Sequence, residues 1–167
     1  MNPALWALAL IAAAQAPAWP LSDARLSLTG LGPVRIGMSE AMVRDVVHAE
    51  LKQRPNGSDG GCRQSSVSRD PGIVFMFEKG TLTRIDIADA HHTTLRGLRI
   101  GDAERRAREL YSGEYEESPH KYVDDGRYLT IRSKDKRHAL VIETDGRFVI
   151  DLRAGVIPSA EYVEGCS

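Results

Sequence analysis

Hydrophobic and polar positions along residues 31–87 predict one helix followed by β structure. Within 39–47 the apolar side chains recur three and four positions apart, which is the spacing of a helix that buries one face. Ser39 is a good N-cap for this helix. Segments 73–78 and 81–87 are rich in β-branched and aromatic residues and flank a short turn, so they predict an antiparallel hairpin.

The same order of elements recurs in residues 95–152. Arg35-Ile36-Gly37 reappears as Arg99-Ile100-Gly101, in each case directly before a helical pattern, and Asp102 is the expected cap of the second helix. Three strand patterns follow it: 127–132, 140–143 and 147–152. This self-similarity predicts a tandem repeat.

We therefore expect an α+β fold of two tandem helix-plus-antiparallel-hairpin units, with the helices packed on one face of an antiparallel sheet. A unit of about 65 residues makes a thin core alone, so the two units would share one sheet. The expected boundaries are a signal peptide over 1–18, a first unit over 19–90, a second unit over 91–157 and a C-terminal tail over 158–167.

An uninterrupted apolar run, residues 4–14, precedes Asp23, the first charged side chain. A run of about 11 residues is too short to span a bilayer, which needs about 20, and is typical of a secretory signal. A buried N-terminal helix is the alternative, since no Lys or Arg precedes the run. No cysteine lies near the expected cleavage site at Ala18. We therefore expect a periplasmic or secreted protein without a stable membrane anchor after cleavage.

The two cysteines fit an exported chain. Cys62 lies in a glycine-rich segment and Cys166 is the penultimate residue. An even, small number of cysteines in an exported protein predicts one disulfide bond, which would tie the tail to the first unit. Two free thiols and an intermolecular bond are the alternatives.

Composition and charge exclude some classes of protein and partner. Apolar residues make up 42% of the 167 residues and charged residues 27%, a globular balance that argues against general disorder. The 22 basic and 23 acidic side chains leave a formal net charge of −1. Nucleic acid and an anionic membrane surface both need a basic footprint, so we expect neither as the main partner.

Candidate chemistry is sparse. His91-His92 with Asp86 and Asp89 is a candidate metal set, but adjacent histidines at a strand end point in opposite directions, so a polar linker is expected. The glycine-rich segment 57–61 matches neither a nucleophile elbow nor a phosphate-binding loop. We therefore expect no enzyme, no catalytic residue, no metal and no cofactor.

The tandem arrangement resembles the β-lactamase inhibitory protein family. The opening Ile36-Gly37-Met38-Ser39, followed by Val43, also resembles the helix start of the small outer-membrane assembly lipoproteins, the SmpA/OmlA family. The resemblance covers residues 28–155 in outline and one short motif per copy in detail. It implies a non-enzymatic, inhibitor-like protein that binds another protein in the bacterial envelope. The chain lacks a lipidated cysteine and the second disulfide of the inhibitor family, and no partner-contacting residue can be matched.

Strand alternation places a second set of side chains on the sheet face away from the helices. This face combines Arg and Tyr, which are enriched in binding hot spots. The candidate partner-binding residues are Arg84, Asp86, Tyr128, Arg132, Asp151 and Arg153. The inward set is expected to include Phe148 and Ile150, and the outward set Leu82 and Val149.

These observations predict an exported, non-catalytic protein-binding module that binds an envelope protein through an open sheet face. The alternative is a protein that binds a small envelope ligand, such as a peptidoglycan fragment, in the groove between the units.

Overall fold

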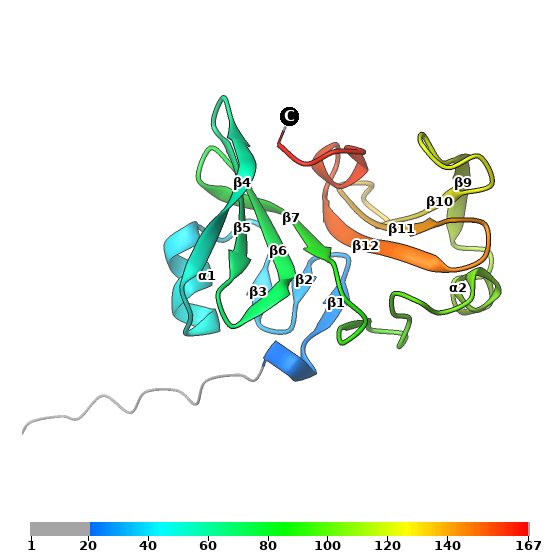
Figure 1. The fold of residues 1–167 in the computed structure, drawn as a ribbon, viewed down its shortest axis with the longest axis horizontal. Helices are drawn as coiled ribbons and strands as arrows, with labels where there is room; N and C mark the ends of the chain where they lie inside the picture. The colour runs from blue at the N-terminus through cyan, green and yellow to red at the C-terminus, as the bar shows by residue number, and fades with distance from the viewer. Residues whose placement is uncertain (1–20, 167) are drawn as a thin grey trace, which may run out of the picture.

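The computed structural model describes residues 21–166, with the side chains of 56–59 left aside. Its largest element is an eight-stranded antiparallel sheet (Figure 1). In spatial order its strands are β4 (Leu51–Asp59), β5 (Cys62–Val67), β6 (Asp70–Glu78), β7 (Thr81–Ile87), β12 (Val149–Val156), β11 (His138–Thr144), β10 (Arg127–Arg132) and β9 (Tyr115–Pro119). β7 and β12 therefore join the two halves of the chain at the centre of the sheet.

A small sheet of short strands adds a second layer. Its order is β3 (Val34–Arg35), β2 (Gly30–Leu31), β1 (Arg25–Ser27) and β8 (Thr93–Thr94). β1 and β8 run parallel, with Leu26 opposite Thr94, so the first described strand is tied to the connection between the halves. Short 3-10 helices lie at Leu21–Asp23 (η1) and Ser159–Glu161 (η2).

The two α-helices begin differently. At the start of α1 (Glu40–Val47), the Ser39 hydroxyl accepts a hydrogen bond from the Met42 backbone N–H at 3.3 Å, as predicted. No side chain among the described residues caps α2 (Glu104–Leu110). Asp102 instead accepts from the Arg99 backbone N–H at 3.0 Å, so its predicted role as the cap is wrong.

The predicted fold class, α+β with two tandem helix-plus-antiparallel-hairpin units and helices packed on one face of the sheet, is wrong. The protein is mostly β, with 46% strand and 15% helix. Each half contributes four strands to the large sheet instead of a hairpin, and a separate four-stranded sheet is present. The proposed boundaries at 19–90 and 91–157 stay predictions, and the signal peptide over 1–18 lies outside the described residues.

The strands that the sequence pattern missed are the two edges of the large sheet. β4 carries Lys, Gln, Arg and Pro, and β9 carries two glutamates and Pro119. Exposed charges and prolines are typical of edge strands, because they discourage pairing with another chain. Edge strands without an apolar face therefore escaped detection by hydrophobic alternation.

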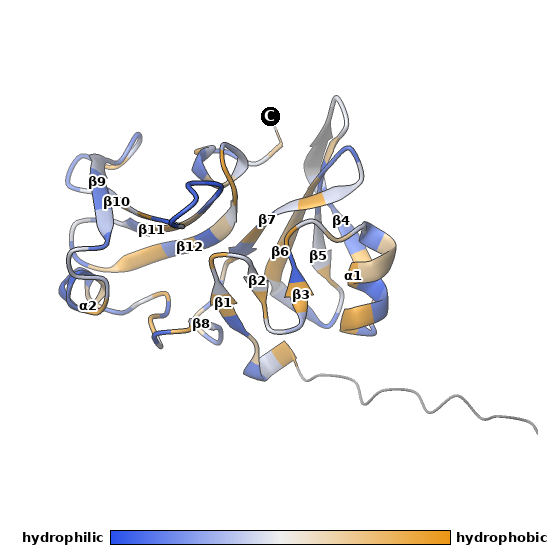
Figure 2. Ribbon diagram, turned by 180° about the vertical axis from the view of Figure 1, so that it is seen from behind, coloured by the Kyte–Doolittle hydropathy of each residue, from blue (hydrophilic) through white to orange (hydrophobic). Residues whose placement is uncertain are grey.

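Two β-bulges change which side chains face the core. The ladder shifts register beside Thr83 on β7 and beside Ile150 on β12. Leu82 and Val149, predicted to point outward, are buried as a result, whereas Phe148 and Ile150 are 43% and 39% exposed. In Figure 2, apolar and polar residues both occur along β12. The predicted facing of these four residues is therefore wrong.

Both halves make the same backbone contacts around the helix entry. Gly37 donates to Leu82 and Leu82 donates to Met38, each at 2.8 Å; Gly101 donates to Val149 and Val149 donates to Asp102, also at 2.8 Å. Leu82 and Val149 therefore occupy corresponding places. Counting along each strand from these residues, Arg84 corresponds to Asp151 and Asp86 to Arg153.

The main core lies between the large sheet and the remaining elements. Val43 and Val47 of α1 and Ala107 of α2 are fully buried there, together with the apolar side chains of β6, β7, β10, β11 and β12. Neither helix in the described part of the chain is long and apolar enough to cross a membrane. The opposite face of the large sheet carries the polar side chains.

Candidate functional site: the polar face of the large sheet

Strand register brings five of the six predicted binding residues together at the centre of the sheet. Arg153 lies opposite Asp86, and Asp151 lies opposite Glu143. Glu143 on β11 lies between two of these residues, because its other neighbour across the ladder is Tyr128 on β10. Arg84, which is two residues before Asp86, shares this face. The alternation argument therefore selected the correct side of the sheet at these positions.

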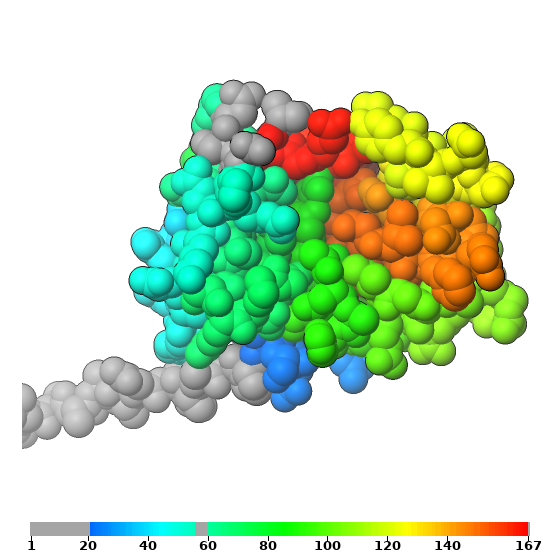
Figure 3. All heavy atoms as spheres, in the orientation of Figure 1, coloured from blue at the N-terminus to red at the C-terminus, as the bar shows by residue number. Residues whose placement is uncertain are grey.

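This polar face is not open, because residues 157–166 cross it. We call residues 157–166 the C-terminal segment. Figure 3 shows it between the first half of the sheet and the β9–β10 region. Its far end is fixed by the disulfide bond between Cys62 and Cys166, with Cα atoms 5.5 Å apart. The disulfide confirms the predicted pairing and closes a loop across both halves.

Arg84 binds the backbone of the C-terminal segment. Its guanidinium donates to the carbonyl oxygens of Tyr162 at 2.8 Å, Glu164 at 3.2 Å and Ser159 at 3.4 Å. It also donates to Asp86 Oδ1 at 2.8 Å through Nε. A buried charge is tolerated only when it is paired and hydrogen-bonded, and the segment supplies three of these four partners.

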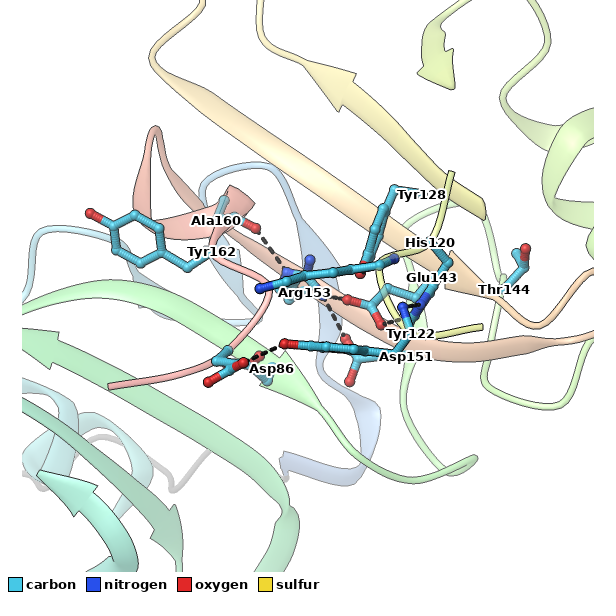
Figure 4. A network of polar contacts seen from close by, with 12 residues as sticks. Asp86, His120, Tyr122, Tyr128, Glu143, Thr144, Asp151, Arg153, Ala160 and Tyr162 are labelled. Carbon is cyan, nitrogen blue, oxygen red and sulfur yellow. Dashed lines mark hydrogen bonds and ion pairs between the residues drawn. The ribbon is translucent and has the colours of Figure 1, made fainter. Parts of the chain in front are cut away.

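Arg153 plays the corresponding part in the second half. It donates to the Ala160 carbonyl at 2.8 Å and forms an ion pair with Glu143. Its guanidinium lies 5.7 Å from the centre of the Tyr128 ring. Figure 4 shows Arg153, Glu143 and His120 pointing toward one another beside Tyr128. Arg84 and Arg153 therefore hold the segment by four main-chain carbonyl groups.

Side chains and apolar contacts complete the attachment. Glu161 pairs with Arg132, and the hydroxyl groups of Ser159 and Tyr122 bind Glu78 and Glu164. A small apolar cluster lies beneath the segment, made by Tyr128, Ala139, Val141, Ile157, Ala160 and Val163. The segment is therefore packed as part of the fold.

Accessibility divides the predicted binding residues into two groups. Arg84, Asp86, Tyr128 and Arg153 are between 2% and 8% exposed, so the expectation that they lie on an open face is wrong. The side chains of Arg132 and Asp151 keep 28% and 31% of their surface accessible. The partner-binding role of all six residues stays a prediction.

Two residues of the network, His120 and Glu143, were not selected from the sequence. The His120 ring stacks on Tyr128 with centroids 4.6 Å apart, and its Nε2 lies 3.1 Å from Glu143 Oε2. His120 was expected to be a solvated loop residue, yet its side chain is only 6% exposed. Glu143 lies two residues after Val141 on β11, so strand alternation places both side chains on the polar face. The sequence therefore contained a signal for Glu143. Nothing in the local sequence singles out His120.

The acidic groups of the network are unevenly balanced. Burial is the largest cause that raises the pKa of Asp151 to about 7, followed by the charge of Asp86; Arg153 lowers this pKa, and Glu143 raises it by a smaller amount. Burial also raises the pKa of the Tyr128 hydroxyl. Asp86 Oδ2 is buried without a hydrogen-bond partner among the described residues. The centre of the face is therefore crowded with carboxylates that only two arginines neutralise.

One part of the polar face is hollow. A pocket of about 360 Å³ lies between the C-terminal segment and strands β9 to β11. Its lining includes Lys121, Tyr128, Thr130, Arg132 and Val163. The pocket is formed by the second half and the segment, so it differs from the groove between units that the sequence suggested.

Comparisons with known proteins bear on the fold alone. No protein-family model matches the chain, and no curated protein matches it. The uncharacterized protein yfeY from Escherichia coli aligns with a TM-score of 0.51 and 17% identity over 78% of this chain and 99% of its own. An extracellular protein containing a SCP domain from Bacillus anthracis aligns with a TM-score of 0.51 and 10% identity over 89% of this chain and 50% of its own. The chain therefore shares a fold with these proteins, and its disulfide is compatible with export.

Proposed function

We propose that this chain is an exported, non-catalytic module of the bacterial envelope that binds another protein through the accessible part of its polar sheet face. The observation that carries the proposal is the pocket beside the C-terminal segment, which Tyr128 lines and where Arg132 and Lys121 remain accessible to solvent. The periplasm or the extracellular medium is its proposed location. The family resemblance of the tandem sequence remains part of this proposal.

The chemistry of the pocket suits a protein partner. Tyr and Arg dominate the binding energy of many interfaces, because they combine apolar area with directional hydrogen bonding. Arg132 is held between Glu116 and Glu161, so its guanidinium is already ordered before a partner arrives. Val141 and Val163 supply an apolar part of the lining, and exposed Lys121 supplies a charge.

The network beneath the segment supports a non-catalytic role. His120 Nδ1 accepts a hydrogen bond from the Tyr122 backbone N–H at 3.1 Å, which leaves the ring proton on Nε2, facing Glu143. Both ring nitrogens are therefore engaged inside the protein. A general base needs a free nitrogen within reach of a substrate proton.

Site-specific photo-crosslinking tests the proposal. A photoreactive phenylalanine analogue replaces Thr130, which lines the pocket, in the full chain exported by a bacterial host. We expect a discrete crosslinked protein at this position. The matched control places the same analogue at Arg105 on α2, whose side chain is 83% exposed and does not line the pocket. Equal crosslinking at both positions, or none at 130, would contradict the proposal.

A charge substitution complements the crosslink. Lys121→Glu changes an exposed pocket residue, so it should reduce crosslinking from position 130 at least tenfold while leaving the melting temperature within about 2 °C. Tyr128 is unsuitable for this purpose, because it packs against His120 and Arg153 and its loss would disturb the fold. Crosslinking that survives Lys121→Glu would place the contact elsewhere.

A small envelope ligand is the alternative occupant. The volume of about 360 Å³ falls within the usual range of small-molecule sites, roughly 300–1,000 Å³. NMR titration with soluble peptidoglycan fragments distinguishes the two functions. Saturable shifts confined to residues around Thr130 would favour the small ligand, and their absence would leave the protein partner as the supported function.

A further inference from the structure

Asp70, Asp89 and His92 come together from two places in the chain, the start of β6 and the connection between β7 and β8. Asp70 begins β6, Asp89 follows β7, and His92 directly precedes β8. His92 Nε2 lies 3.0 Å from Asp70 Oδ2, and one ligand atom from each residue lies within 4.8 Å of the others. This cluster is distinct from the polar face, where Asp86 is paired with Arg84.

The cluster has a buried floor and an accessible mouth. His92 is 1% exposed, whereas the side chains of Asp70 and Asp89 keep 21% and 28% of their surface accessible. An ion entering from solvent would therefore meet both carboxylates and rest on the imidazole. Three protein ligands with a solvent-facing position are a common arrangement for Zn²⁺.

His92 faces the two carboxylates with Nε2, which contacts Asp70 and would have to give up its proton to bind an ion. A histidine that coordinates through Nε2 must carry its proton on Nδ1. His92 Nδ1 is buried and has no hydrogen-bond partner in the described part of the chain, so no N–H group occupies it. His120 differs, because the Tyr122 N–H occupies its Nδ1. The proton of His92 can therefore move to Nδ1, whereas that of His120 is fixed on Nε2.

The charge of the cluster also calls for a cation. Within residues 21–166, no Arg or Lys forms an ion pair with Asp70 or Asp89. Two like charges held this close repel each other unless a positive charge lies between them. On the polar face, by contrast, Glu143 and Asp86 each form an ion pair with an arginine, Arg153 and Arg84.

Local backbone structure fixes the position of Asp89. A Cβ atom at Gly72 would lie 1.7 Å from Asp89 Oδ2, so only glycine leaves room for this carboxylate. The Ala88 N–H donates to the Gly72 carbonyl at 2.8 Å, and the His91 N–H donates to Asp89 Oδ1 at 2.9 Å. These contacts hold one carboxylate oxygen and leave Oδ2 beside the cluster.

We propose that Asp70, Asp89 and His92 form a binding site for a divalent transition-metal ion, with Zn²⁺ as the favoured ion. One imidazole and two carboxylates suit Zn²⁺, whose bonds to such ligands are about 2.0–2.2 Å long. Both carboxylates are partly accessible, so their side chains can rotate toward the ion. The sequence analysis named His92 and Asp89 in a candidate metal set with His91 and Asp86, but expected no metal because adjacent histidines point in opposite directions. It missed Asp70, which is distant in the chain. The site is independent of the proposed partner-binding face.

Calorimetric titration of the untagged full chain with ZnCl₂ tests the site. We expect one equivalent to bind with a micromolar or lower Kd and to raise the melting temperature. Asp89→Asn keeps an acceptor for the His91 N–H but loses the charge, so it should weaken Zn²⁺ binding at least tenfold. Asp70→Asn should weaken it similarly. Both replacements retain the volume of the native side chain.

One control variant separates this site from general attraction of metal ions. Asp124→Asn/Asp125→Asn removes an exposed acidic pair from a turn and should bind Zn²⁺ with the native Kd. His91 is unsuitable as a control, because its Nδ1 lies 3.7 Å from Asp89 Oδ2. The proposal is overturned if the native chain binds no Zn²⁺ at millimolar concentration, or if Asp70→Asn and Asp89→Asn bind it as tightly as the native chain.

Discussion

The first and second halves of the large sheet share backbone contacts but reverse the order of their charges. The first half carries Arg84 and then Asp86, whereas the second carries Asp151 and then Arg153. Because β7 and β12 pair antiparallel, this reversal sets Arg153 opposite Asp86. If the second half repeated the charge order of the first, two aspartates would lie opposite each other and repel. The apolar positions of the halves are therefore repeated, while their polar positions are complementary.

The halves also differ in how the C-terminal segment covers them. In the first half, Val74 and Met76 on the polar side are fully buried and Cys62 anchors the end of the segment. In the second half the segment leaves a pocket between itself and β9 to β11. The two halves thus share a scaffold, and in the second half the segment borders an accessible hollow on the polar face.

The largest expected effect comes from cutting the link between the halves. Cys62 and Cys166 are 104 positions apart, and closing such a loop stabilises a fold by about 4–5 kcal/mol in the chain-entropy model. Cys62→Ser/Cys166→Ser should therefore lower the free energy of unfolding by several kcal/mol in urea denaturation. Reduction of the native chain serves as a control and should match the double variant. An unchanged midpoint would show that the disulfide does not stabilise the segment.

The charge reversal is tested by removing one arginine at a time. Arg84→Met leaves Asp86 buried without its cation, and Arg153→Met does the same to Glu143. Each substitution should therefore lower the free energy of unfolding by about 3–5 kcal/mol. Hydrogen exchange distinguishes them. Arg84→Met should speed exchange from Ser159 to Glu164, because it frees three carbonyls, whereas Arg153→Met should act mainly near Ala160.

Arg105→Met is the matched control for both arginine variants, since that side chain lies exposed on α2. Its stability should change by no more than about 0.5 kcal/mol. If Arg84→Met and Arg153→Met behaved like this control, the segment would not depend on the two guanidinium groups.

Asp151 tests the electrostatic cost of the crowded centre. Burial and neighbouring carboxylates raise its pKa to about 7 from 3.8, so its stabilising contribution is present below pH 4 and lost as the pH rises through 7. Asp151→Asn should raise the free energy of unfolding by about 1 kcal/mol at pH 8, a value reduced for the 31% of its side chain that is accessible. Thermal denaturation at pH 4 should show no gain, and an equal gain at both pH values would contradict this assignment.

The smallest effects concern the two helix starts. Ser39→Ala should destabilise the chain by about 1 kcal/mol, because it removes the side-chain cap of α1. Ala103 has the same extended backbone, with φ −61° and ψ 140°, but offers no cap. Ala103→Ser should therefore stabilise the second half by about 0.5 kcal/mol in urea denaturation. A loss at position 103 would show that the two helix starts are not equivalent.

Local patterns predicted what depends on neighbours along the chain. The helix at Ser39, the hairpin of β6 and β7 and the cysteine pairing were all predicted from the sequence. Alternation also placed Tyr128 and Arg153 on one face of the sheet. It failed at Ile150 and Leu82, because a bulge shifts the phase of alternation and leaves no mark in the hydrophobic pattern.

The sequence by itself determined the apolar periodicity of each half, the capping of α1 and the presence of one pair of cysteines, because these depend on side-chain chemistry and short spacing. Only the tertiary structure decided that edge strands β4 and β9 complete the sheet and that residues 157–166 cover its polar face. It also decided that Asp70 meets Asp89 and His92. Such contacts join residues distant in sequence, and their energy comes from burial and charge pairing that exist only once the sheet has formed.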